Sequence, residues 1–203
     1  MRQVEAPPLI LASASAARRA LLEAAGIAFT VRPAHIDEAG VKRLAQARGS
    51  TAADAAMTLA ELKAAAIAAQ APDAVVIGAD QILVCDGVWF DKPASLAEAR
   101  QHLRHLRGKS HVLATTVVVL CGPERLWRHV AEPRLTMRSF SDAFLEEYLA
   151  VEGDALRHSV GAYRLEGTGV HLFDRIEGEH SAILGLPLLS LFGFLRQHGL
   201  LGG

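Results

Sequence analysis

The chain has 203 residues, of which 51% are hydrophobic and 21% charged, enough apolar material to fill a stable core without disulfides. Its 21 basic and 22 acidic residues give a net charge of −1, so we expect no nucleic-acid partner, which would require a basic surplus. No apolar run approaches the ~20 residues of a membrane span, and the N-terminus lacks the apolar stretch of a signal peptide. We therefore expect a cytoplasmic protein with no membrane partner.

The first part of the chain predicts a strand, a helix and an extended segment. The short apolar run 9–12 is typical of a strand. A helix is expected to begin after Ser15, since serine caps a first turn well, and to end near Gly26, because glycine commonly follows a last turn. The segment 29–37 is extended in character, although Pro33 makes it a poor central strand.

The middle of the chain predicts a helix, a buried strand and a hairpin. Residues 51–70 are rich in alanine and other strong helix formers, which makes this the clearest helix. The apolar run 74–79 is typical of a buried strand. Residues 82–91 are expected to form a separate hairpin that turns at Asp86 and Gly87, a pair common in two-residue turns.

The second half of the chain again mixes helices and strands. We expect helices at 95–108, 141–151 and 188–199, and strands at 111–121 and 134–140. The first two of these helices open with a serine, in the position of an N-cap. Helices and strands do not alternate in the regular order of a doubly wound fold, so the predicted fold class is α/β with a mixed sheet.

Cysteines and histidines do not predict a metal or disulfide framework. Cys85 and Cys121 lie in or beside apolar runs and are interpreted as two buried free thiols. His102 and His105 are three apart, but no Cys/His set has the spacing of a zinc site, so zinc is not predicted. The absence of G-x-S-x-G disfavours a serine hydrolase, and the absence of the D-x-D pattern at Asp80 disfavours an aspartyl-phosphate mechanism.

The first candidate binding site is the predicted strand-to-helix turn that contains Ser13, Ser15 and Arg18. Free backbone N–H groups and the positive end of the helix dipole favour an anion there. Arginine in the first turn opposes that dipole, which is understandable if a phosphate occupies the site. The alternative is a capped surface helix with two solvated arginines.

Asp80 is the second candidate, because it follows an apolar strand and not a helix. A carboxylate at the edge of a buried sheet must be paired or take part in chemistry. It could serve as a general base for a water molecule or as a ligand of Mg²⁺. The alternative is an ordinary turn or cap aspartate.

Three further charged residues complete a possible ring around this carboxylate. Lys92 follows the predicted hairpin and precedes a proline, whose fixed φ helps to aim the lysine. Glu38 and Lys63 lie earlier in the chain. Each of them, taken singly, is more simply read as a solvated side chain.

Seven ordered segments carry a family resemblance from about residue 9 to the last helix. They are LILASASAARRALLEAAGI, the DE pair at Asp37 and Glu38, LAELKAAA around Lys63, IGADQ with the later DKP, LRGKSHVLATTVVVL, GAYRLEGTGVHLFDRIEG and LGLPL. Together they resemble the Maf family of nucleoside triphosphate pyrophosphatases. The resemblance implies one domain over residues 1–203, with an elongated mixed sheet in two lobes around a nucleotide cleft, and a possible homodimer.

The same resemblance implies hydrolysis between the α- and β-phosphates of a nucleoside triphosphate, with Mg²⁺ or Mn²⁺ as cofactor. Asp80 matches the proton acceptor of the family. Positions expected to hold phosphates or metal are matched by Ser13, Arg18, Glu38, Lys63 and Lys92. Asp80 and Glu38 are the expected metal ligands. Lys92 and Glu38 are expected to be catalytic together with Asp80, and Ser15 is expected to bind substrate beside Ser13.

Three positions bear on which base is bound. Gln81 and Glu166 resemble the branch of the family that acts on 7-methyl-GTP, since a carboxylate can accept hydrogen bonds from the N1–H and N2–H₂ groups of guanine. Ala17 stands where that branch often has a tryptophan, so a possible stacking surface for the base is missing at this substrate-binding position. A pyrophosphatase of the dTTP/UTP type and a nucleotide-binding regulator of cell division without turnover are the alternatives.

Overall fold

The computed structural model describes residues 7–202, which fall into two compact units. The first unit comprises the chain up to Gln81, Thr115–Ala131 and the segment from Glu179 onward. The second unit comprises Ile82–Ala114 and Glu132–Gly178.

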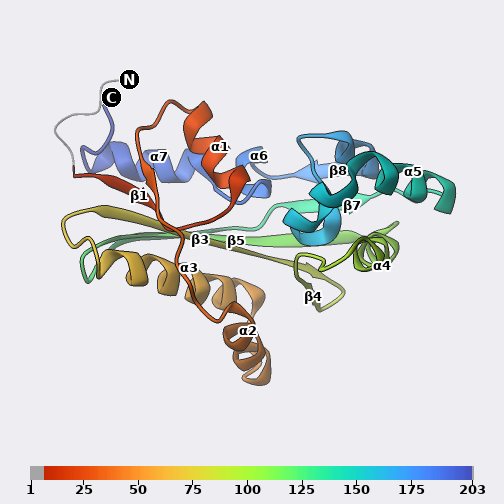
Figure 1. Cartoon of the computed structure of the whole chain (residues 1–203), viewed down its shortest axis with the longest axis horizontal. Helices are drawn as coiled ribbons and strands as arrows, with labels where there is room; N and C mark the ends of the chain where they lie inside the picture. Colours follow the sequence, from red (N-terminus) through yellow and green to blue (C-terminus); the bar gives the residue numbers. More distant parts are fainter. Residues whose placement is uncertain (1–6, 203) are drawn as a thin grey trace. The chain divides into compact units, whose positions relative to one another are not determined.

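Residues 7–202 contain eight strands in one mixed sheet, with the order β2-β1-β3-β5-β7-β8 (Figure 1). β4 pairs with β3 and β6 pairs with β5. β1 is parallel to β2 and β3, whereas β4, β6, β7 and β8 pair in antiparallel fashion. This is the mixed α/β class that the sequence predicts. The strands are β1 Leu9–Leu11, β2 Thr30–Val31, β3 Val75–Cys85, β4 Val88–Phe90, β5 Ser110–Cys121, β6 Glu124–Ala131, β7 Arg134–Met137 and β8 Phe173–Glu177.

Serine and threonine side chains cap the N-termini of four helices. Ser15, Thr51, Ser95 and Ser141 each accept a hydrogen bond from a backbone N–H three residues on, which satisfies one of the donors left open in a first turn. The described α-helices are α1 Ala16–Ala24, α2 Glu38–Ala47, α3 Ala52–Ala68, α4 Leu96–Leu106, α5 Asp142–Glu152, α6 His180–Ile183 and α7 Leu188–Gln197, and the 3-10 helices are η1 Gly153–His158, η2 Val160–Ala162 and η3 Thr168–Leu172. No helix within residues 7–202 is long and apolar enough to cross a bilayer.

The largest departure from the predicted elements is β3. The sequence divides this region into a strand that ends at residue 79 and a separate hairpin, but Val75–Cys85 is one continuous strand. Two polar residues, Asp80 and Gln81, interrupt the apolar run without ending the strand, because each side chain has a partner in the protein. The predicted turn is confirmed: Cys85 pairs with Val88, and the two residues between them have the positive φ values of a tight hairpin.

Sequence patterns miss α2, β6, β8 and the 3-10 helices η1–η3. In the structure of residues 7–202, α2 has a capping aspartate and buries none of its own residues, and Gly40 in its first turn weakens the helix signal. β6 is missed because its sequence, ERLWRHVA, mixes charged and apolar residues.

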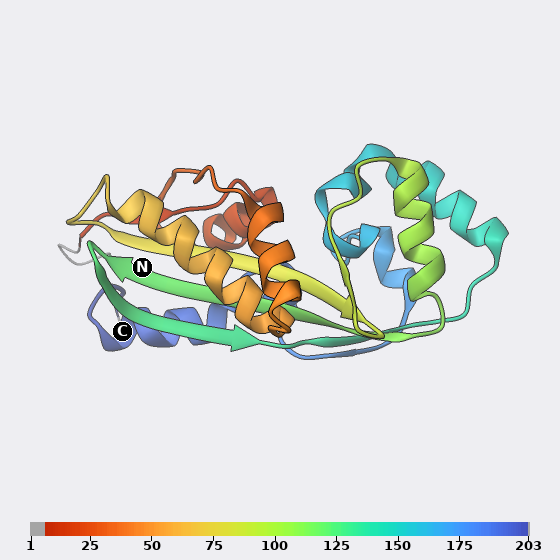
Figure 2. The ribbon, with the colours of Figure 1, turned by 90° about the horizontal axis from the view of Figure 1, so that it is seen from below.

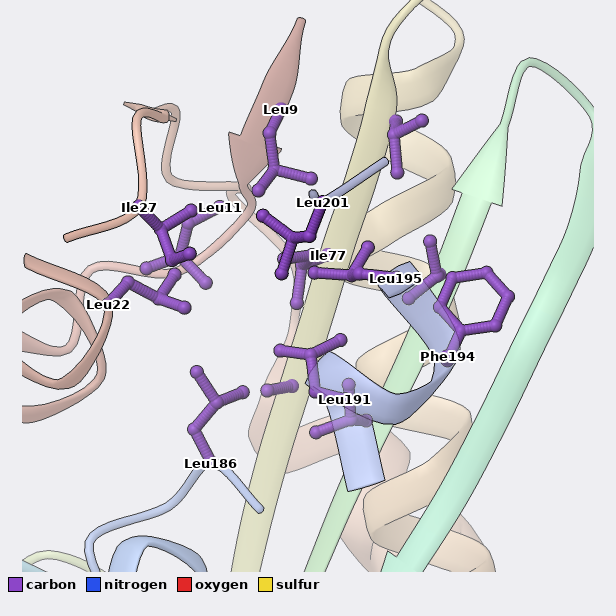
Figure 3. Close-up of a cluster of buried hydrophobic side chains, with 14 residues drawn as sticks. Leu9, Leu11, Leu22, Ile27, Ile77, Leu186, Leu191, Phe194, Leu195 and Leu201 are labelled. Carbon is purple, nitrogen blue, oxygen red and sulfur yellow. The ribbon is translucent and has the colours of Figure 1, made fainter. Parts of the chain in front are cut away.

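The core of the first unit lies on both faces of the sheet. One cluster joins β1, β3 and β5 to α1 and α7 (Figure 3). The other joins the same strands to α3. Figure 1 shows α3 and α7 on opposite sides of these strands, and Figure 2, seen from below, shows α3 lying across them with α2 next to it. Because successive strand residues face opposite sides, residues 75, 77 and 79 of β3 belong to the first cluster and Val76 to the second.

Gly78 allows α3 to lie directly on β3. A Cβ atom at Gly78 would meet the carbonyl oxygen of Ala60 and would lie 2.8 Å from the Cβ atom of Ala64. Real Cβ atoms do not approach other atoms this closely, so any side chain here would push α3 away from the strand.

We expect Gly78→Ala to lower the free energy of unfolding by about 3 kcal/mol, the upper range for overpacking. The matched control is Gly193→Ala in the interior of α7, where an added Cβ meets nothing within 4 Å. That substitution should stabilise the protein by about 0.5–1 kcal/mol, because alanine loses less backbone entropy than glycine in a helix. Urea denaturation of both variants measures the difference, and equal effects would contradict the close approach of α3.

The second unit contains a buried histidine–tyrosine pair. A ring nitrogen of His111, Nε2, lies 2.9 Å from the hydroxyl oxygen of Tyr163, and the other ring nitrogen is buried without a hydrogen-bond partner in the described chain. Burial lowers the pKa of His111 to about 4, because the charged imidazolium would lose its hydration. His111 is therefore neutral in the native protein at neutral pH.

This pair makes the stability of the protein dependent on pH. Between pH 6.5 and about 4 the unfolded chain binds a proton at His111 that the native protein does not, so stability should fall as the pH falls through this window. The loss should be on the order of 3 kcal/mol at pH 4 and should not grow below it. Urea denaturation at a series of pH values measures this loss. His111→Gln should remove it, whereas His158→Gln, at an exposed position of the same unit, should retain it.

The cysteines are both free, as the sequence predicts. Cys85, the last residue of β3, is buried, but Cys121 at the end of β5 is only half-buried. The prediction of two buried thiols is therefore confirmed for Cys85 and only in part for Cys121.

Candidate active site

Lys63 connects two carboxylates in the first unit. Its Nζ atom lies 2.5 Å from Oδ1 of Asp80 and 2.8 Å from Oε1 of Glu38. The three residues come from α3, β3 and the first position of α2. Lys63 and Asp80 are buried, whereas the Glu38 side chain is 47% exposed. The cluster therefore consists of a buried ion pair with a second carboxylate at the surface.

The second carboxylate oxygen of Asp80, Oδ2, is buried and has no hydrogen-bond partner among residues 7–202. A buried acceptor without a partner costs free energy, and such an atom in a native protein calls for an explanation. A water molecule or a divalent cation would each satisfy it. Mg²⁺ and Mn²⁺ prefer carboxylate oxygens, so the donor set of Asp80 and Glu38 fits either ion.

Local sequence explains why this cluster forms. Residues of one parity on β3 face α3, and Gly78 and Asp80 both belong to that set. Close approach at Gly78 brings α3 near enough for Lys63 to reach the carboxylate. The alanine-rich face of α3 leaves space beside the lysine stem, since Ala60 and Ala64 are fully buried there.

The Arg18 side chain is buried and anchored to three parts of the first unit. Its Nη1 atom donates to Oγ of Ser13 at 3.1 Å and to the carbonyl of Ala79 at 2.9 Å, and its Nε atom donates to the carbonyl of Gly185 at 2.9 Å. Burial lowers the pKa of Arg18, and the negative charges of Asp80 and Glu38 oppose this effect. Nη2 donates no hydrogen bond within residues 7–202, so this edge of the guanidinium can still receive an anion.

The turn before α1 has the predicted geometry. Ser15 caps α1 by accepting a hydrogen bond from the backbone N–H of Arg18, and Ser13 is buried, with its Oγ atom also accepting from the N–H of Ser15. Ala17 is half-buried in the first turn of α1. The alternative of two solvated arginines is wrong for Arg18 and correct for Arg19, whose side chain is exposed.

Gln81 faces away from Asp80, as expected for successive residues of a strand. Its Nε2 atom donates to Oγ1 of Thr115 at 2.7 Å and to the carbonyls of Ala182 and Ile183 at 3.0 and 3.1 Å. Thr115 also donates to the carbonyl of Ala182. The Gln81 amide nitrogen therefore holds α6 against the sheet. Thr115 is absent from the predicted site, because a threonine inside a β-branched run carries no distinguishing signal.

Comparison with known proteins identifies the family. Residues 8–198 match the family model described as Maf-like protein. The chain belongs to the Maf family. A nucleoside triphosphate pyrophosphatase of Granulibacter bethesdensis is 57% identical over 190 residues, which cover 94% of this chain and 96% of that protein. One of Rhodospirillum rubrum is 52% identical over 195 residues, covering 96% of each. A 7-methyl-GTP pyrophosphatase of Rhizobium meliloti is 47% identical over 193 residues, covering 95% of this chain and 97% of that protein.

Two of the residues singled out from the Maf motifs lie in the second unit. Lys92 is exposed in the loop between β4 and α4. Glu166 lies between η2 and η3, where its Oε1 atom accepts a hydrogen bond from Nε of Arg164 at 3.3 Å. The proposed roles of these two residues stay predictions.

A further side chain, Glu152, fixes the loop that carries Glu166. It accepts hydrogen bonds from Nη1 of Arg164 at 3.0 Å and from both the backbone N–H and the hydroxyl of Thr168, at 3.0 and 2.6 Å. These bonds tie residues 164 and 168 of the Maf segment GAYRLEGTG to the end of α5. Sequence reasoning misses Glu152, because the last acidic residue of a helix is usually solvated.

Proposed function

We propose that this Maf protein is a nucleoside triphosphate pyrophosphatase that hydrolyses the α–β phosphoanhydride bond, releasing a nucleoside monophosphate and pyrophosphate. The observation that carries the proposal is the buried Asp80 carboxylate, whose Oδ1 is held by Lys63 while Oδ2 has no partner in the described chain. A fixed carboxylate with one open oxygen has the geometry of a general base. The relatives of Granulibacter bethesdensis and Rhodospirillum rubrum are named for the same activity, which supports the proposal.

In the proposed reaction, Asp80 is the general base, and basic residues and serines bind the phosphates. Oδ2 of Asp80 accepts a proton from the attacking water, whose oxygen forms the new bond to phosphorus as pyrophosphate leaves. Lys63 holds Asp80 in place and offsets its charge. Arg18 and the Ser13 turn bind phosphate oxygens through Nη2 and backbone N–H groups. Lys92 adds a further cation for the triphosphate.

A divalent cation, Mg²⁺ or Mn²⁺, would be held by Asp80 and Glu38. When bound, it would offset the charge that develops on the phosphate oxygens. Glu38 is suited to this because it stands at the first position of α2 with an exposed carboxylate, while Lys63 fixes one of its oxygens.

For the base, we propose 7-methylguanine. Glu166 offers a carboxylate that suits both the N–H donors of guanine and the positive charge of an N7-methylated ring. The Rhizobium meliloti relative named for 7-methyl-GTP supports this choice. Arg164 lies against Glu166 and fixes the direction of the carboxylate, but it also offsets part of the negative charge.

A panel of nucleoside triphosphates with Mg²⁺ or Mn²⁺ tests the proposal through the release of pyrophosphate. We expect the highest kcat/KM for 7-methyl-GTP and no release when the metal is chelated. Preferential turnover of dTTP and UTP would instead assign the protein to the pyrimidine type. Tight nucleotide binding with no pyrophosphate release would contradict the enzyme and favour a regulatory protein.

Glu166→Gln should change substrate preference without abolishing catalysis. Hydrogen bonds to a charged group contribute about 1.5–3 kcal/mol, so kcat/KM for 7-methyl-GTP should fall about ten- to a hundredfold. The value for dTTP should stay the same. Glu147→Gln, on an exposed position of α5, is the matched control and should leave both values unchanged. An unaltered preference in Glu166→Gln would remove this residue from base recognition.

A further inference from the structure

Three potential metal ligands meet in the second unit, and none of them is assigned to the proposed reaction. Cys85, Asp86 and His105 each offer one ligand atom, and these atoms all lie within 4.8 Å of one another. They come from the end of β3, the first residue of the β3–β4 turn and the last turn of α4. Twenty residues separate the cysteine from the histidine, which is why no short zinc spacing appears in the sequence.

A second observation concerns the His105 imidazole itself. The ring nitrogen Nε2 of His105 is buried and has no hydrogen-bond partner within residues 7–202. The edge of the Phe90 ring packs against the imidazole, with the ring centroids 5.1 Å apart, so the ring is fixed in position. The Cys85 thiol makes a weak contact among residues 7–202, a 3.7 Å approach to the carbonyl of Ser110. The imidazole and the thiol thus retain capacity to coordinate an ion.

We propose that Cys85, Asp86 and His105 form a binding site for Zn²⁺, with water as the fourth ligand. Sulfur, nitrogen and carboxylate oxygen are the donors that zinc takes in tetrahedral sites, and three protein ligands with one open position are common. The ligand set discriminates against Mg²⁺, which prefers oxygen donors only. Zinc is here a second cation, chemically distinct from the one proposed for Asp80 and Glu38.

Binding requires three local changes. Lys109, whose Nζ atom lies 3.0 Å from Oδ2 of Asp86, must release the carboxylate, and its exposed side chain is free to turn into solvent. The S–H bond of Cys85 breaks as the Zn–S bond forms, and the proton passes to the solvent. The ligand atoms, which lie within 4.8 Å of one another, must also draw together around the ion.

Titration of the full-length protein with Zn²⁺ tests the site, with heat measured in two buffers of different ionisation enthalpy. We expect one site that releases a proton on binding and raises the melting temperature. Co²⁺ as a probe should give the absorption band of a thiolate–cobalt bond. Changes to residues that merely support the metal ligands typically weaken metal binding about ten- to a hundredfold. Cys85→Ser and His105→Ala remove a ligand itself, so each should weaken Zn²⁺ binding by at least about a hundredfold.

Matched controls lie in the same chain. Cys121→Ser and His102→Gln remove the other thiol and the neighbouring helix histidine, and binding should persist in both. Asp86→Asn keeps the turn, because asparagine before glycine also favours it, and should weaken binding with the fold intact. The thiolate–cobalt band should remain in Asp80→Asn, which separates this site from the proposed catalytic centre. Absence of that band in the native protein, or Zn²⁺ binding unaltered in Cys85→Ser and His105→Ala, would overturn the proposal.

Discussion

Asp80→Asn is expected to lower kcat for pyrophosphate release by about 10²–10⁴, the usual contribution of a general base. Asparagine has nearly the shape of aspartate but cannot accept the proton of the attacking water. Lys63 keeps its 2.8 Å contact with Glu38, so the variant should fold. Steady-state kinetics with 7-methyl-GTP measure the loss, and circular dichroism verifies the fold.

Asp73→Asn is the matched control for this substitution, because Asp73 is exposed just before β3. Its kcat should equal that of the native protein. A fully active Asp80→Asn variant would remove Asp80 from the mechanism, whereas a loss confined to KM would make it a binding residue only.

Lys63→Met is expected to have the largest effect on stability. Methionine keeps much of the apolar stem but removes the ammonium group between Asp80 and Glu38. Removing one partner of a buried ion pair leaves an uncompensated charge and typically costs about 3–5 kcal/mol. We therefore expect the free energy of unfolding, measured by urea denaturation at pH 7.5, to fall by this amount, with loss of pyrophosphate release as well.

A double variant tests whether the charge on Asp80 is the cause. Combining Lys63→Met with Asp80→Asn removes both charges of the pair, so it should be more stable than Lys63→Met alone although it remains inactive. Lys109→Met removes an exposed lysine–aspartate pair and should change stability by less than about 1 kcal/mol. If the double variant were less stable than Lys63→Met, unpaired charge would not explain the loss.

Sequence patterns predict those elements that are amphipathic or apolar and carry a clear cap. Helices α1, α3, α4 and α5 begin near the predicted residues because their serine or threonine caps act locally. The hairpin turn follows from its aspartate–glycine pair for the same reason. Helix α7 begins after Pro187, without a side-chain cap, and is predicted from its apolar sequence. β8 is missed because three of its five residues are charged. α2 is missed although Asp37 caps it, because a glycine in its first turn weakens the helix signal.

The sequence predicts which residues belong to the candidate site, but it does not predict which of them contact one another. The motif identifies Asp80, Lys63 and Glu38, yet only the structure shows that the lysine lies between the two carboxylates. The function of Gln81 is also not evident from the sequence, because two of its three partners are backbone carbonyls about a hundred residues away. A side chain that binds backbone places no constraint on the type of residue opposite it.

The two carboxylates of the cluster differ in how firmly the protein holds them. Asp80 belongs to a strand paired with neighbours and covered on both faces, whereas Glu38 opens a helix that buries none of its residues in the described structure. Elements with so few buried contacts open locally at low free energy, so the amide protons of α2 should exchange with solvent long before those of β3. If a nucleotide and its cation bind Glu38, they should slow amide-proton exchange throughout α2. Exchange in α2 would then reveal ligand binding even at residues that do not contact the ligand.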